Sequence, residues 1–232
     1  WWEVGHPRRC LGGAVHHEQP PAVLFCDGGE LLHSIWRHLS ARLRDVPQVR
    51  KAHGGEAGPL EQLECVGNAG EGGAAVAGAI TGLLTGHDYD HVVATMDFHI
   101  DPGEHFSDDP DYRVSWPRHC VVGTPGVDFH ENLDPAAVEA VFTKGEFSAA
   151  YSGFEGTDAD GTSLTDWLAR RGVDAVDVVG IATDYCVRAT ALDAAAAGLR
   201  TRVLLPLCAG VAADTTAEAV ALLRARGVEV TE

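Results

Sequence analysis

Segments with strand character alternate with segments of helical period from about residue 72 to residue 230, and this alternation limits the fold more than any other feature. Residues 91–96, HVVATM, and 175–181, AVDVVGI, are mostly apolar, as strands buried on both faces of a sheet usually are. Strands that alternate with helices form parallel sheets. The sequence therefore predicts an α/β fold, a doubly wound and mainly parallel sheet with helices on both faces.

The expected elements leave one long stretch without regular structure. Helices are predicted at 72–86, near 134–142, and at 163–172, 183–199 and 215–227, with further strands at 201–207 and 228–230. Residues 97–133 are polar, contain four prolines and have no sustained period. Because a loop of this length in a compact domain is usually functional, we expect it to contribute to the site.

Charge and composition exclude several classes of function. The net charge of the 232-residue chain is −17, which would repel nucleic acid and anionic membranes. The chain has no apolar run long enough for a membrane span and no signal-peptide pattern, and its six cysteines are scattered without a CxxC pair. We expect a cytoplasmic protein with reduced thiols that acts on a small molecule.

Four potential metal ligands follow the strand at 91–96. Ligands bind beyond the carboxyl ends of strands in such sheets, and the polar residues beyond this strand include Asp97, His99, His105 and His119. Alternate residues at a strand end point to the same side, so Asp97 and His99 can share one ion. A carboxylate with three imidazoles suits Zn, Mn or Fe(II). The alternative is that these are solvated loop histidines.

Two further side chains could be reactive, Cys186 and Lys144. Cys186 lies in the first turn of the helix predicted at 183–199, where the helix dipole and N–H groups favour a nucleophilic thiolate suited to acyl transfer. Lys144 follows an apolar run and precedes Gly145, so it could project from a strand end and stabilise that thiolate. A buried structural cysteine and a surface lysine are the alternatives.

Four motifs, DFHIDPGEHF, WPRHCVVGTPG, KGEFSAAYSGF and GIATDYCVRATALDAA, together resemble those of the nicotinamidase group of the isochorismatase-like cysteine hydrolases, in the same order. The resemblance covers about residues 72–230. It implies a metal-dependent amidase that hydrolyses nicotinamide and pyrazinamide, small carboxamides, to the acid and ammonia. A related isochorismatase-like amidase with another substrate is the alternative within the same class.

The resemblance also implies a role for each site residue. One divalent metal ion would be bound by Asp97, His99, His105 and His119. Catalysis would depend on the nucleophile Cys186 and its basic neighbour Lys144. An oxyanion hole would be formed by the backbone N–H groups of Ala182 and Cys186, shaped by a cis peptide bond between Ile181 and Ala182. The substrate pocket would be lined by Trp116, Tyr151, Ile181, Ala182 and Tyr185.

The first 66 residues depart from the family's pattern. They hold seven Lys or Arg against eight Asp or Glu, whereas the remaining residues hold ten against 26, so the composition changes near residue 66. The family's opening strand, which ends in a catalytic Asp, is absent at the spacing expected before the metal motif. We therefore divide the chain into an atypical segment, residues 1–66, and an isochorismatase-like hydrolase domain, residues 67–232.

Two interpretations of the atypical segment stay open. In the first, AVLFC at 22–26 is the missing strand, Asp27 is the proton carrier, and a helix follows at 30–43. In the second, which we prefer on the sequence, the segment is non-native or disordered, since the chain begins with Trp1 and the motifs start abruptly after it. The chain would then be a catalytically impaired, metal-binding member of the family.

Overall fold

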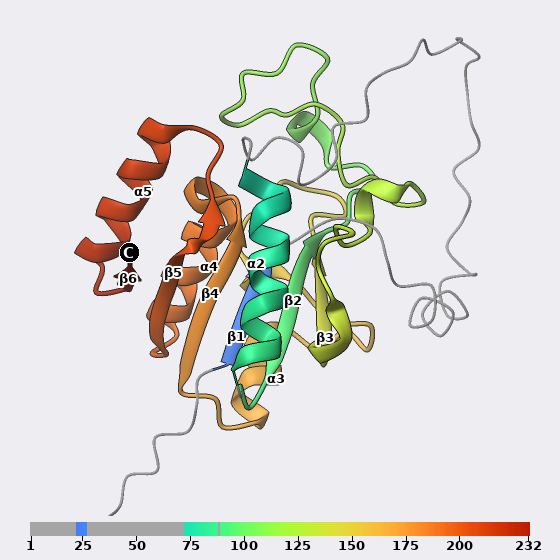
Figure 1. The fold of residues 1–232 in the computed structure, drawn as a ribbon. Coiled ribbons are helices and arrows are strands. Elements are labelled where there is room, and N and C mark those ends of the chain that lie inside the picture. Colours follow the sequence, from blue (N-terminus) through green and yellow to red (C-terminus); the bar gives the residue numbers. More distant parts are fainter. Residues whose placement is uncertain (1–21, 27–71, 88) are drawn as a thin grey trace, which may run out of the picture.

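A six-stranded parallel sheet forms the centre of the fold (Figure 1). The computed structural model describes residues 22–26, 72–87 and 89–232. The strands are β1 (Ala22–Cys26), β2 (Val92–Asp97), β3 (Ala140–Lys144), β4 (Ala175–Ile181), β5 (Arg200–Ala209) and β6 (Glu229–Thr231). They lie in the order β3-β2-β1-β4-β5-β6, and every neighbouring pair is parallel. The predicted doubly wound α/β fold is confirmed.

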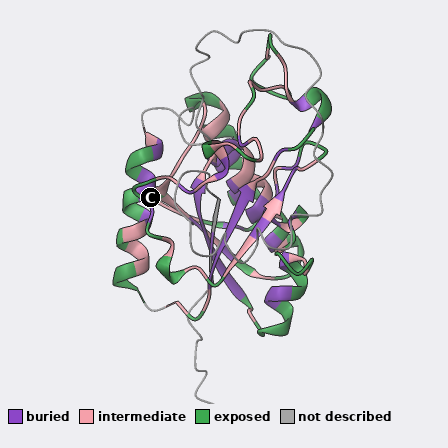
Figure 2. Cartoon of the chain, turned by 90° about the vertical axis from the view of Figure 1, so that its right-hand side faces the viewer, coloured by how far each residue is buried: buried purple, intermediate pink, exposed green. Residues whose placement is uncertain are grey.

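Helices cover both faces of this sheet. On one face lies α2 (Gly73–Gly86), whose Ile80 belongs to a buried cluster with Ala94 and Val179 from the strands. The core on the other face contains residues of α3 (Leu164–Arg170), α4 (Arg188–Ala196) and α5 (Ala213–Ala225). Figure 2 shows the buried residues concentrated in the strands between these layers. Among the described residues, no helix combines the length and the apolar character that crossing a bilayer requires.

The segment at 134–142 differs from the short helix expected there. Only a 3₁₀ turn forms, η5 (Pro135–Ala137), and the chain then continues as strand β3. Phe142 is fully buried, and β3 pairs with β2 along its length. Burial and strand pairing outweigh the helical preference of the Ala and Glu residues, so the predicted helix is wrong. From residue 72 onward, the other predicted helices and strands lie where the sequence places them, within a few residues at their ends.

Strand β1 lies in the middle of the sheet, between β2 and β4. It is the part of residues 1–66 that the structure describes, so Asp27 and the helix expected at 30–43 lie outside the described residues. Cys26 is level with Thr95 on β2 and with Gly180 on β4. The order of the strands reverses between β1 and β4, and ligands bind at the carboxyl edge beside such a reversal. This placement favours the interpretation of AVLFC as the family's opening strand.

Candidate active site

Three strands end at the same edge of the sheet with reactive side chains at or just beyond their ends. β2 ends at Asp97 and β3 ends at Lys144, and these two residues are opposite each other in the parallel register. β4 ends at Ile181 and leads into η7 (Thr183–Val187), the π-helical turn that contains Cys186. Because parallel strands place their carboxyl ends together, the fold brings the predicted nucleophile, lysine and metal-binding carboxylate to one place.

Lys144 contacts both of the other groups. Its side chain is 2% exposed. The ammonium donates hydrogen bonds to the Asp97 carboxylate, to the carbonyl of Ala150 at 2.8 Å and to Cys186 Sγ at 3.6 Å. A buried charge is costly unless it is paired and hydrogen-bonded, and these contacts satisfy both conditions. Lys144 is therefore not a surface lysine, and a fixed cation this close to Sγ favours the thiolate of Cys186.

Asp97 carries the charge opposite to that of Lys144. Burial acts to raise the pKa of this carboxyl, but the Lys144 ammonium and then His99 lower it, so that the net pKa lies below the ordinary value for Asp. The carboxylate is therefore ionised at neutral pH, both as an ion-pair partner and as a group that can bind a cation.

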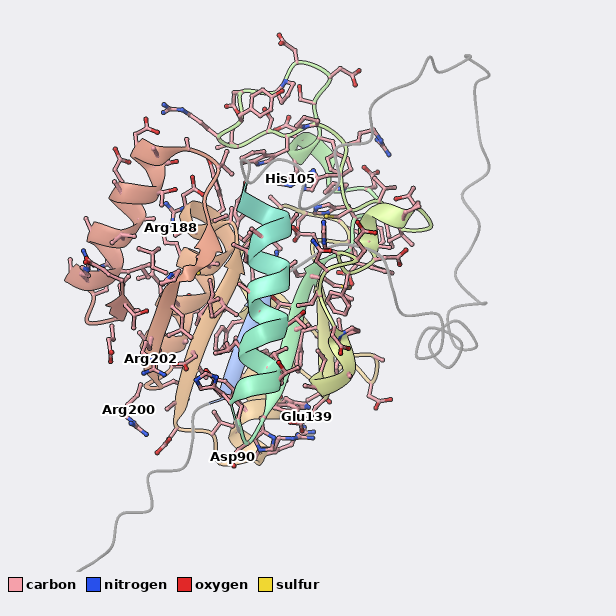
Figure 3. The ribbon with its side chains drawn as sticks, in the orientation of Figure 1. Asp90, His105, Glu139, Arg188, Arg200 and Arg202 are labelled. Carbon is pink, nitrogen blue, oxygen red and sulfur yellow. The ribbon has the colours of Figure 1, made fainter. Side chains whose placement is uncertain are left out.

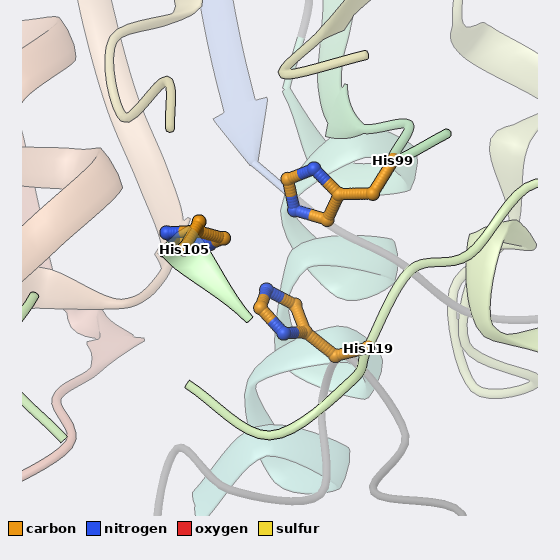
Figure 4. Close-up of side chains that lie close together, drawn as sticks. All are labelled: His99, His105 and His119. Carbon is orange, nitrogen blue, oxygen red and sulfur yellow. The ribbon is translucent and has the colours of Figure 1, made fainter. Parts of the chain in front are cut away.

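Three histidines form a cluster at this edge (Figure 4). His99, His105 and His119 each offer one ligand atom, and these atoms all lie within 4.8 Å of one another. His99 Nδ1 donates to the carbonyl of Gly145 at 2.6 Å, and His119 Nδ1 donates to that of Pro117 at 2.7 Å. Backbone carbonyls thus orient both rings and leave Nε2 for a ligand, as in many metal sites. His99 and His105 are buried, so they are not solvated loop histidines.

A divalent metal ion fits this cluster. His99 Nε2 is buried and has no hydrogen-bond partner, which is unfavourable unless a ligand binds there. Burial lowers the pKa of His99, and burial, followed by the neighbouring His119 and His99, lowers that of His105 to about 4. These two imidazoles are neutral at pH 7, the form that binds metals. A ligand atom of Asp97 lies within 4.8 Å of one from His119, but His99 and His105 are not part of that second group, so the four-residue ligand set stays a prediction.

Gly145 makes the contact that orients His99. Its φ is +78°, and a Cβ at this position would lie 2.8 Å from His99 Cε1. Glycine is therefore needed both for the backbone conformation and for the close approach of its carbonyl to the ring. The sequence alone assigned this residue no role, although it follows Lys144 in a recognised motif.

Cys120 lies next to the metal-ligand candidate His119. Its Sγ is within 4.8 Å of ligand atoms of Asp97 and His119, but the residue is disulfide-bonded and cannot act as a thiolate ligand. The expectation that all cysteines are reduced is wrong for Cys120. Cys186 and Cys208 carry thiols.

The turn that contains Cys186 continues directly into α4. The peptide bond between Ile181 and Ala182 is cis, as predicted. The N–H groups of Tyr185 and Val187 donate to the carbonyl of Ala182, at 3.0 and 3.1 Å. Cys186 is partly exposed, so a small substrate has access to the thiol.

Asp184 connects this turn to the start of α5, a role that the sequence did not suggest. It is 1% exposed, and its carboxylate accepts hydrogen bonds from the N–H of Val211 at 2.9 Å, from the N–H of Ala212 at 3.3 Å and from the Thr215 hydroxyl. These donors lie at the start of α5, 27 to 31 residues away. Only the folded structure brings them to the carboxylate.

We expect Asp184→Ala to lower the free energy of unfolding by about 2–4 kcal/mol, because it leaves three donors without their charged acceptor. Urea denaturation measures the loss. The matched control is Asp214→Ala, which removes an exposed acceptor of the Thr215 N–H in the first turn of α5 and should cost about 1 kcal/mol or less. Equal losses in the two variants would contradict the role of Asp184.

Aromatic side chains surround the histidine cluster and the nucleophile turn, which is η7 (Thr183–Val187) with the predicted nucleophile Cys186. The Trp116 indole N–H donates to the Tyr151 hydroxyl at 3.1 Å. The Tyr185 ring packs edge-on against Trp116, with centroids 4.9 Å apart, and the Tyr151 ring lies 5.9 Å from that of His105. Burial raises the pKa of the Tyr151 and Tyr185 hydroxyls, so both stay protonated. The structure thus brings together the three aromatic residues predicted for the substrate pocket.

Known proteins are similar to this chain in sequence and in fold. The isochorismatase domain matches residues 88–232. The nicotinamidase/pyrazinamidase of Mycobacterium tuberculosis is 63% identical over 160 residues, which are 68% of this chain and 86% of that protein. PnC1 from L. infantum, solved in complex with nicotinate, has 25% identity and a TM-score of 0.66, over 92% of this chain and 93% of its own. The pyrazinamidase of Pyrococcus horikoshii, solved in complex with zinc, has 27% identity and a TM-score of 0.60, over 92% of this chain and 99% of its own. The chain therefore belongs to the isochorismatase family.

Proposed function

We propose that this chain is a metal-dependent cysteine amidase that hydrolyses nicotinamide and pyrazinamide to the corresponding acid and ammonia. The observation that carries the proposal is the position of the Lys144 ammonium, which contacts both Asp97 and Cys186 Sγ. The identity to a nicotinamidase/pyrazinamidase and the fold shared with a nicotinate complex support the same substrate class. We further propose that the enzyme acts in the cytoplasm.

In the proposed reaction, Cys186 Sγ attacks the carboxamide carbon. Negative charge then develops on the carbonyl oxygen, where the backbone N–H groups of Ala182 and Cys186 would stabilise it as an oxyanion hole. The C–N bond breaks, ammonia leaves with the proton that its nitrogen gains, and a thioester remains on Cys186. Water attacks the thioester, the acid is released, and the thiol is restored.

The surrounding residues would orient the substrate. Lys144 would stabilise the thiolate of Cys186 once its proton is removed. The flat ring of the substrate would lie in a pocket lined by Trp116, Tyr151, Ile181, Ala182 and Tyr185. Asp97, His99, His105 and His119 would bind a divalent ion. When bound, this ion would supply positive charge that attracts the lone pair of a heteroaromatic ring nitrogen. The zinc complex of the Pyrococcus horikoshii relative supports Zn, and Mn or Fe(II) suits the same ligands.

The reaction also needs a group that takes the proton from Cys186 and gives it to the leaving ammonia. Asp97 is paired with Lys144, and Asp184 accepts hydrogen bonds from the start of α5, so both carboxylates have other roles. We propose Asp27 for this step, because it directly follows β1, the strand between those that lead to Asp97 and Cys186. A chain in which no group does this would be the catalytically impaired alternative.

An ammonia-release assay with nicotinamide tests the proposed function. We expect the metal-loaded protein to release equal amounts of ammonia and nicotinate. Hydrolysis of an aliphatic amide such as maleamate, but not of nicotinamide, would instead favour a related amidase with another substrate. A protein that retains its metal and hydrolyses neither amide would be the impaired family member.

The metal assignment predicts that the purified protein binds about one equivalent of Zn, Mn or Fe, and that His99→Ala binds it at least about 100-fold more weakly. The reason is that His99 Nε2 is buried and oriented by its Nδ1 contact with Gly145. Elemental analysis after dialysis against a graded chelator measures this. The control is His87→Ala, which removes an exposed histidine at the end of α2. Retention of a full equivalent by His99→Ala would exclude His99 as a ligand.

A further inference from the structure

The loop at 107–115 is a folded unit that leads to Trp116. Its two ends meet where Phe106 and Trp116 form an isolated parallel bridge. Its tip is organised by Asp111, whose carboxylate accepts hydrogen bonds from three backbone N–H groups at 2.9 Å each, those of Arg113, Val114 and Ser115. The loop is mostly exposed, so contacts from outside it decide where its tip lies.

One such contact comes from the nucleophile turn. The Tyr185 hydroxyl donates to the backbone carbonyl of Tyr112 at 3.1 Å, across 73 residues of sequence. Tyr112 has a φ of +56°, an uncommon conformation for a residue with a side chain. Its N–H donates to the carbonyl of Ser115 at 3.1 Å. The loop tip thus has an unusual backbone conformation at Tyr112. The carbonyl of this residue accepts a hydrogen bond from Tyr185, the residue next to Cys186.

Contacts with other aromatic rings of the candidate site also fix the position of the Tyr185 ring. Its ring packs edge-on against Trp116 and lies 5.5 Å from the Tyr151 ring. The Arg188 guanidinium lies 5.9 Å from the centroid of the same ring, on the side toward α4. The Tyr185–Tyr112 hydrogen bond therefore joins the loop that leads to Trp116 to the nucleophile turn.

We infer that Tyr185 is a positioning residue that ties the 107–115 loop to the nucleophile turn and so holds Trp116 where the substrate ring binds. The inference rests on the proposed function. Without this hydrogen bond, only a fraction of molecules would have the loop in place, and the apparent affinity for substrate would fall by that fraction. The bound complex would still contain the closed loop, so its rate of reaction would not change.

The test is Tyr185→Phe, which removes the hydroxyl and keeps the ring. We expect KM for nicotinamide to rise about 3- to 10-fold, the effect of one hydrogen bond, while kcat stays within about twofold. The second readout needs no activity: trypsin should cleave after the exposed Arg113 faster by a similar factor, with the product identified by mass. Tyr89→Phe is the matched control, since it removes a hydroxyl bonded to Asp177, away from the loop. It should leave KM and cleavage after Arg113 unchanged.

Each outcome decides the inference. Unchanged KM in Tyr185→Phe would overturn it, with or without faster cleavage. A fall in kcat that matches the rise in KM would overturn it as well, because that pattern indicates general damage to the site. If the unaltered protein does not hydrolyse nicotinamide, the proposed function fails, and unchanged cleavage after Arg113 would then show separately that Tyr185 does not hold the loop.

Discussion

Replacing Cys186 with alanine is expected to lower kcat for ammonia release by roughly 10⁴-fold or more, because the thioester can no longer form. The thiol lies 3.6 Å from the Lys144 ammonium, and no other thiol of the described residues lies at this edge of the sheet beside a fixed cation. Single-turnover measurements with nicotinamide would show the loss directly. The proposed metal ligands are untouched, so the variant should retain its full metal content.

The matched control for this change is Cys208→Ala. Cys208 lies on β5 beside Gly180 of β4, and its thiol donates to the carbonyl of Leu204 at 3.3 Å. It is a cysteine on the strand next to β4, whereas the Lys144 ammonium contacts Cys186. We expect Cys208→Ala to retain activity, and iodoacetamide to modify Cys186 first at neutral pH. Activity retained in Cys186→Ala, or equal alkylation of the two thiols, would exclude Cys186 as the nucleophile.

Most of the sheet was predictable because its strands are buried on both faces. Val93 and Val178 are fully buried, and the apolar runs around them indicate strands without any knowledge of their partners. The site was predictable for a related reason. In a parallel sheet the residues after each strand meet at one edge, so Asp97 and Cys186 could be placed together from their positions in the sequence.

Contacts between distant segments were not predictable in the same way. Asp184 accepts hydrogen bonds from the start of α5, and the Tyr185 hydroxyl donates to Tyr112. The sequence around these two residues, however, looks like that of an ordinary helix. Strand β3 shows the same limit, since its pairing with β2 decides its conformation against a local pattern that favours a helix. Local sequence reports propensity, whereas these features depend on partners 27 to 73 residues away.

Strand β1 shows how composition can mislead. AVLFC is short and lies in a segment whose charge balance differs from the rest of the chain, and on the sequence alone both features favour a non-native segment. In the sheet, however, it pairs with β2 on one side and β4 on the other, and Leu24 is fully buried. A five-residue strand with two neighbours makes enough hydrogen bonds and apolar contacts to outweigh the weak local signal. The division at residue 66 stays a prediction for the rest of the segment.

Asp27→Asn is expected to lower kcat by roughly 10²- to 10⁴-fold, the usual contribution of a positioned acid–base group. Asn has nearly the same shape as Asp but cannot take the thiol proton or pass it to ammonia. The expectation follows from β1, the strand that Asp27 follows in the sequence: its last residue, Cys26, is level with Thr95 of β2 and Gly180 of β4, near the ends of the strands that lead to Asp97 and to the turn of Cys186. Ammonia release at saturating nicotinamide measures the effect, and elemental analysis checks that the metal is retained.

The control for Asp27→Asn is Asp90→Asn, at an exposed residue just before β2. Asp90 lies at the opposite end of the sheet from His105, as Figure 3 shows, so the same change of charge there should leave kcat unaltered. Full activity in Asp27→Asn would exclude it as the proton carrier. If, in addition, replacing residues 1–71 with a family-like start that carries the strand and its Asp raised activity by roughly 10²-fold or more, the chain would be the catalytically impaired member of the family. The two experiments together therefore distinguish two cases. If Asp27 is the acid–base group, Asp27→Asn loses activity. If the chain has no such group, Asp27→Asn has no effect, and only the replaced start raises activity.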